Sequence, residues 1–183
     1  LRTTLSPRAP QAEGIGPQRH ALWMRRILGT RVDPEETYTW ATRELERVIA
    51  EQDAIAVDIL GPGADADDLN RHLRADPTRA LSPGDYTIWA QEVADEAWDA
   101  VVGRVLDPPD GLGRPWVRLG EPGAGAVHYE EPRGTGGERR PGMVLRSLSD
   151  GERLVWPWME RTTVLHESVP GHHVHVGAHA TST

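Results

Sequence analysis

Apolar residues recur at helical spacing over most of the chain, and this pattern predicts a mainly helical protein. Residues 1–19 are interrupted by several prolines and glycines, so we expect them to form an extended arm. Behind this arm, residues 20–28 predict a short helix that ends at a glycine, and we expect Leu22, Trp23 and Ile27 to face inward.

Two long amphipathic helices follow. Asp33 followed by a proline predicts the first over residues 34–60, because Asp is a preferred N-cap and proline suits the first helical position. Ser82 followed by a proline gives the same signal for the second, over residues 83–105, and a shorter helix is predicted over 65–73 with both of its leucines buried. The predicted inward faces of the two long helices are Tyr38, Ala41, Leu45, Val48, Gln52, Ile55 and Ile59 on the first and Tyr86, Trp89, Val93, Ala97, Val101 and Val105 on the second.

The pattern changes after residue 115. Short runs rich in β-formers occupy residues 116–119, 125–129 and 142–146, and Gly/Pro-rich turns separate them. These runs predict a small antiparallel β element, after which the helical pattern returns near Trp158. We therefore predict one mainly helical domain over residues 20–183.

The composition of the chain excludes several classes of function and of metal ligand. The net charge of −8 argues against a nucleic-acid surface, which needs a concentrated basic patch. No apolar run approaches the roughly 18–20 residues that span a bilayer, so no membrane contact is expected. The first residues lack the pattern of a signal peptide, which predicts a cytoplasmic protein. Cysteine is absent, so any bound metal must be held by His and carboxylates.

Histidines concentrate near the end of the chain, and one of them precedes a glutamate. A His-Glu pair with further histidines nearby is typical of a zinc hydrolase helix, in which imidazoles hold the metal and the glutamate takes a proton. A histidine-rich chain end without a fixed metal is the other interpretation. The residues concerned are His166, Glu167, His172, His173, His175 and His179.

The spacing differs from the usual H-E-x-x-H. Four residues after His166 comes Pro170, and His172 follows at i+6 and His173 at i+7. On a straight helix the first would point roughly 120° away and the second would lie about 10 Å along the axis. Because proline and the following Gly171 disrupt a helix, we predict a distortion between residues 168 and 172 that brings His172 to the metal.

Residues 163–174 resemble the H-E-x-V-P-G-H-H-L-Q signature of the bacterial DUF885 family, and upstream segments are similar to that family in the same order. The resemblance implies a mainly α, gluzincin-like peptidase architecture, of which this chain is an internal or C-terminally truncated portion. The similar upstream segments are residues 21–23, 33–38, 126–132, 140–142 and 158–163.

By position, the resemblance implies that His166 and His172 bind Zn²⁺ and that Glu167 is the general base. Whether His173 replaces His172 stays open. The third ligand in the family is a glutamate from a later helix, and the chain ends at Thr183 before such a segment. The resemblance also implies a substrate-facing position for His128 or Tyr129. Arg140 lies in the R-P-G turn of the family, and two roles stay open for it: substrate binding, or a surface arginine of the turn.

The implied function is a zinc-dependent peptidase or amide hydrolase acting on a peptide or small amide. Metal-bound water would attack the carbonyl with Glu167 as base. Two alternatives stay open: a catalytically inactive truncated homologue, and a non-catalytic metal-binding helical protein. The apolar stripes of the long helices require partners, so a homo-oligomer is a further expectation.

Overall fold

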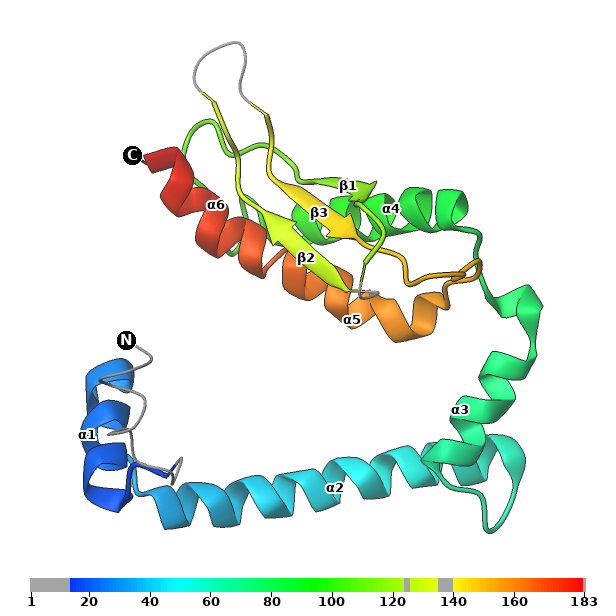
Figure 1. Cartoon of the computed structure of the whole chain (residues 1–183), viewed down its shortest axis with the longest axis horizontal. Helices are drawn as coiled ribbons and strands as arrows, with labels where there is room; N and C mark the ends of the chain where they lie inside the picture. Colours follow the sequence, from blue (N-terminus) through cyan, green and yellow to red (C-terminus); the bar gives the residue numbers. More distant parts are fainter. Residues whose placement is uncertain (1–13, 124–125, 135–139, 183) are drawn as a thin grey trace, which may run out of the picture. The chain divides into compact units, whose positions relative to one another are not determined.

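The computed structural model describes residues 14–123, 126–134 and 140–182 (Figure 1). The contacts of the chain divide it into two compact units, Leu1–Leu69 and Asn70–Thr183. The described residues are mainly helical and include one small sheet, as the hydrophobic pattern predicts. Among the described helices, none is long and apolar enough to cross a bilayer.

The first unit contains α1 (Pro17–Leu28) and α2 (Pro34–Leu60). Both predicted ends of α2 are confirmed: the Asp33 carboxylate accepts hydrogen bonds from two backbone N–H groups of the first turn, and the helix ends at Gly61. Helix α1 begins three residues earlier than predicted. Most of the predicted arm, residues 1–13, lies outside the described residues.

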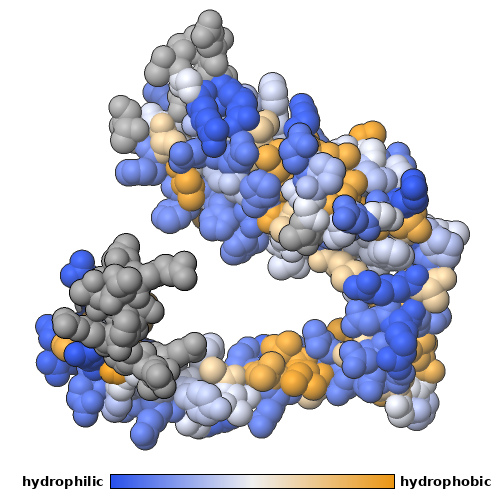
Figure 2. Space-filling model, in the orientation of Figure 1, coloured by the Kyte–Doolittle hydropathy of each residue, from blue (hydrophilic) through white to orange (hydrophobic). Residues whose placement is uncertain are grey.

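The apolar faces of α1 and α2 are exposed. The prediction that Leu22, Trp23 and Ile27 face inward is wrong, because these side chains are 68%, 53% and 75% exposed. Of the residues of α2, Ala56 is the buried one, and Figure 2 shows apolar side chains gathered at the surface of this helix. Periodicity indicates that a helix has an apolar face, but it carries no information about what covers that face.

Helix α3 (Ala66–Ala75) follows, and its two leucines are half-buried rather than fully buried. The second unit then contains α4 (Pro83–Val101), α5 (Pro157–Glu167) and α6 (His172–Ser182). Ser82 caps α4 by accepting a hydrogen bond from the Asp85 N–H, as its sequence predicts. This helix ends before the predicted residue 105, and Val105 is exposed.

Three strands form the sheet: β1 (Trp116–Leu119), β2 (Val127–Glu130) and β3 (Met143–Arg146), in the order β1-β3-β2. The small β element is confirmed, but it is mixed rather than antiparallel throughout. Strands β2 and β3 pair antiparallel, whereas β1 runs parallel to β3. Strand-forming residues and turns locate strands along the chain, but they do not determine the direction in which distant strands pair.

The core of the second unit lies between α4, α5 and the sheet. In Figure 1, α5 and α6 follow one another alongside β2, and α4 covers β1. Helix α4 packs its buried face against β1 and α5. The fully or nearly fully buried core residues are Tyr86, Ala90, Val93, Ala94, Val117, Val144, Val155 and Val164.

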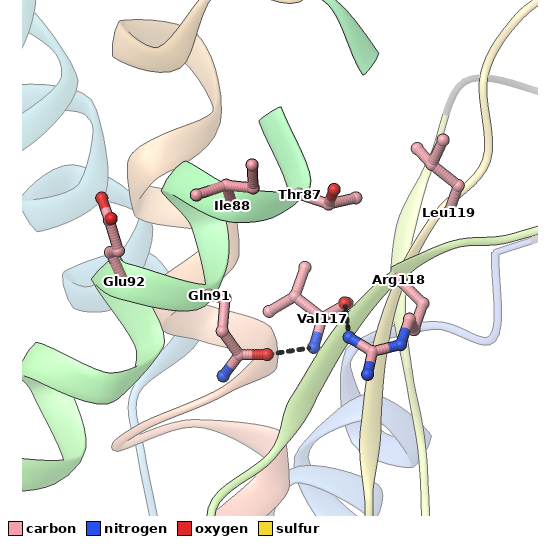
Figure 3. Close-up of a pocket in the computed structure, with 7 residues that line it drawn as sticks. All are labelled: Thr87, Ile88, Gln91, Glu92, Val117, Arg118 and Leu119. Atoms are coloured by element: carbon pink, nitrogen blue, oxygen red, sulfur yellow. Dashed lines mark hydrogen bonds between the residues drawn. The ribbon is translucent and has the colours of Figure 1, made fainter. Parts of the chain in front are cut away.

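A hollow of about 480 Å³ lies between α4 and β1 (Figure 3). At its floor, the Gln91 side-chain oxygen accepts a hydrogen bond from the Val117 N–H, and the Gln91 amide donates to the carbonyl of Pro115. Arg118 folds back to donate to the Val117 carbonyl. Side chains thus satisfy polar backbone groups of β1 that do not pair with β3.

Candidate metal centre

The His-Glu motif lies at the end of α5, where the helix is interrupted. His166 and Glu167 form its last turn, and α6 begins at His172. Between the helices Ser168 leaves helical geometry, with φ −101° and ψ −102°, and its hydroxyl donates to the Val164 carbonyl at 2.6 Å. The predicted distortion between residues 168 and 172 is therefore confirmed, and it is a complete break between two helices.

Gly171 allows the chain to turn back on α5. A Cβ atom at this position would overlap the carbonyl oxygen of His166 and would lie 2.9 Å from the Cα atom of His166. Only a residue without a side chain permits this approach. Val169, which is fully buried, anchors the same turn, and the Val169–Pro170 peptide bond is cis. The close approach of Gly171 to His166 brings the following residue, His172, back beside His166.

The turn gathers three potential metal ligands. The ring centroids of His166 and His172 are 4.7 Å apart, and Nε2 of His172 lies 4.0 Å from the Glu167 carboxylate. One donor atom from each of the three residues lies within 4.8 Å of the others. His166 is exposed, His172 is half-buried and Glu167 is 9% exposed, so the group faces solvent above a nearly buried carboxylate.

The donor set suits zinc. Zinc accepts imidazole nitrogen and carboxylate oxygen at about 2.0–2.2 Å, so two ligands of one tetrahedral ion lie roughly 3.3 Å apart. The separation in this group is up to 4.8 Å, and the side chains would have to draw together by up to about 1.5 Å on binding. Within the described residues, this is the one such group of three or more His, Asp or Glu side chains.

His173 has a different environment from His172. Its side chain is fully buried, and its Nε2 lies 2.8 Å from the Gly113 carbonyl oxygen. A carbonyl only accepts, so Nε2 carries the proton and Nδ1 accepts from the Tyr129 hydroxyl at 2.9 Å. Burial lowers the pKa of the His173 imidazole, which favours this neutral form. Because both ring nitrogens are engaged, His172 rather than His173 joins the group.

The three residues with an implied substrate role lie outside the group. Tyr129 is half-buried on β2 with its hydroxyl on His173, and burial, with the nearby Glu131 carboxylate, raises the pKa of this hydroxyl. His128 alternates to the exposed side of the same strand. Arg140 forms an ion pair with Glu130 at 2.6 Å. A role for these residues in binding substrate stays a prediction.

Other carboxylates close to the motif in sequence are engaged elsewhere. Arg146 is buried at the end of β3, and its guanidinium lies 2.6 Å from Glu152 and 3.2 Å from Glu160. The helix that carries the motif thus begins with a buried ion pair to the sheet and ends with the candidate ligands.

The sequence interpretation missed the contact between Tyr129 and His173, which lie 44 positions apart. Alternation along β2 was the available signal, because it places Tyr129 and His128 on opposite faces. No local pattern links His173 to Gly113, or Tyr129 to the start of α6.

Comparison with known proteins agrees with the motif. A family model described as "Bacterial protein of unknown function (DUF885)" matches residues 1–183. No curated protein matches the chain. Since the family model spans all of the residues, the chain belongs to the DUF885 family.

Proposed function

We propose that the chain carries the zinc ligands of a metal-dependent peptidase or amide hydrolase, in which His166 and His172 hold the metal. The observation that supports this proposal is the break between α5 and α6. The break brings together two histidines, whose spacing would keep them apart on a straight helix, and a glutamate. A histidine-rich chain end without a metal would not require Gly171 to approach the His166 carbonyl so closely.

When bound, zinc would supply polarisation of an amide carbonyl and a lower pKa for a coordinated water. The remaining chemistry belongs to the chain. Glu167 is assigned as general base because it is adjacent to His166 and nearly buried, so its carboxylate is held at the ligands rather than in bulk solvent. It would take a proton at the carboxylate and return it to the leaving nitrogen.

Catalytic zinc usually has three protein ligands, and His166 and His172 supply two. Glu167 cannot act as base while its carboxylate is occupied as a ligand. The family resemblance implies another glutamate as the third ligand, and no further carboxylate of the described residues joins the group. The three grouped residues are potential metal donors whether or not a reaction follows, so metal binding without turnover is a second candidate function.

Zinc content after dialysis against metal-free buffer tests the site. We expect about one tightly held zinc, lost on His166→Ala and on His172→Ala. Glu167→Gln should retain the zinc and abolish hydrolysis of peptide and small amide substrates. His175→Ala, on the exposed side of α6, is the matched control and should leave zinc bound at this centre.

The outcomes separate the candidates. Metal binding alone is supported if zinc is held tightly, is lost in both ligand substitutions, and no amide is hydrolysed. An unaltered chain that retains no zinc contradicts both candidates.

A further inference from the structure

We propose that His173 and Tyr129 are positioning residues for His172, and that they determine how well the two candidate ligands fit one metal ion. This inference rests on the proposed metal centre. It assigns to His173, the neighbour of His172 in the sequence, a task distinct from ligation.

His173 joins three segments that are distant in sequence. Its ring is bonded to Gly113 in the loop before β1 and to Tyr129 on β2, while its backbone belongs to the first turn of α6. The ring also contacts Trp98 of α4, with centroids 5.8 Å apart. With both nitrogens bonded and no exposed surface, this imidazole has one available orientation.

Two glycines make room for this pair. A Cβ atom on Gly142, just before β3, would lie 2.7 Å from Nδ1 of His173 and would overlap the Tyr129 hydroxyl. A Cβ atom on Gly177, one turn along α6, would lie 2.7 Å from the same hydroxyl. Neither glycine position leaves room for a side chain, because the hydrogen-bonded Tyr129 and His173 side chains fill the space between the sheet and α6.

The position of His172 follows from these contacts. His172 and His173 share a peptide group, so a displacement of the buried ring moves the backbone of the ligand. The backbone N–H of His173 also donates to the Ser168 carbonyl at 3.2 Å, which ties the start of α6 to the turn after α5. The distance between His166 and His172 is thus controlled from both sides of the break.

The test measures zinc affinity by competition with a chelator, the absorption spectrum of the Co²⁺-substituted chain, and thermal unfolding of the metal-free chain. The parent for all variants is the full chain with His175→Gln and His179→Gln. These two exposed residues lie at i and i+4 on α6, a spacing that binds metals adventitiously.

Four substitutions remove the hydrogen bonds of the His173 ring to different extents. His173→Leu removes both ring bonds, His173→Asn keeps an acceptor near Nδ1, His173→Gln keeps a donor near Nε2, and Tyr129→Phe removes one hydroxyl. We expect zinc affinity to fall about 10–100-fold in His173→Leu, as for lost outer partners of metal ligands, with partial rescue by Asn and Gln. The Co²⁺ absorption bands should shift in the same order.

Lower thermal stability with unchanged zinc affinity and an unchanged Co²⁺ spectrum would overturn the inference, since His173 would then be structural alone. If His173→Leu does not fold, Tyr129→Phe and His173→Gln decide, because they keep the size of the buried group. Failure of the proposed function gives a different result: the parent itself would bind no zinc, or would keep it in His166→Ala.

Discussion

Helices α2 and α4 carry equally clear sequence signals, yet they differ in what they bury. Both begin at a polar N-cap followed by proline, and both show an apolar stripe. Helix α4 buries its stripe against the sheet and α5, whereas α2 leaves most of its large apolar side chains exposed. The comparison teaches that local signals determine where a helix forms, and that packing determines which positions matter for stability.

The largest effect is expected in the turn of the candidate metal centre. Gly171→Ala places a methyl group on the His166 carbonyl, so we expect a loss of unfolding free energy on the order of 4 kcal/mol, together with loss of the proposed zinc binding. Gly84→Ala, in the first turn of α4, meets only ordinary contact and should change stability by less than about 1 kcal/mol. Urea unfolding and zinc content of the two variants provide the check, and equal stability would refute the close approach.

A slightly smaller effect is expected at the buried ion pair of the second unit. Arg146→Met should cost about 3 kcal/mol, because it leaves Glu152 and Glu160 close together without their cation. Arg47→Met on α2, which removes an exposed pair to Glu44 and Glu51, is the matched control. It should cost less than about 1 kcal/mol. Comparable losses in urea unfolding would contradict the expected difference between the buried ion pair at Arg146 and the exposed pairs on α2.

The comparison can be tested directly at two apolar positions. Val144→Ala in β3 should destabilise by about 2 kcal/mol, because the side chain is fully buried. Ile55→Ala on α2, where the side chain is 52% exposed, should change stability by less than about 1 kcal/mol. A large loss at Ile55 that depends on protein concentration would instead indicate that a second copy covers α2, as a homo-oligomer requires.

The smallest effect concerns the N-caps, where the two helices should behave alike. Asp33→Ala and Ser82→Ala each remove a side chain that accepts backbone hydrogen bonds, and each should cost about 1 kcal/mol. Circular dichroism at 222 nm during thermal unfolding measures both. If only Ser82→Ala lowers the stability, the Asp33 cap adds nothing to α2, whose apolar face is exposed.

Much of the fold could be predicted from the sequence because its signals are local. The caps Asp33 and Ser82, the glycine stop after α2 and the three short strands all lie where short-range chemistry places them. The parallel pairing of β1 with β3 and the exposure of α2 could not be predicted, since they depend on contacts between distant segments.

The candidate site, like the fold, could be predicted only where its signals are local in sequence. Residue types and the helix-disrupting Pro170 were sufficient to predict that His166 and His172 need a break between them. The choice between His172 and His173 required the fold, because it depends on Tyr129 and Gly113 occupying the ring of His173. Adjacent residues on a helix face different surroundings, and sequence spacing alone does not say which of them faces solvent.

The buried ring of His173 also provides an internal spectroscopic probe. Its Nε2 proton is held on the Gly113 carbonyl in a fully buried environment, so it should exchange slowly with solvent. A slowly exchanging ring N–H proton gives its own resonance in proton NMR spectra, so no probe has to be attached to the protein. Its resonance would report the packing of α6 on the sheet while Zn²⁺ is titrated into the sample.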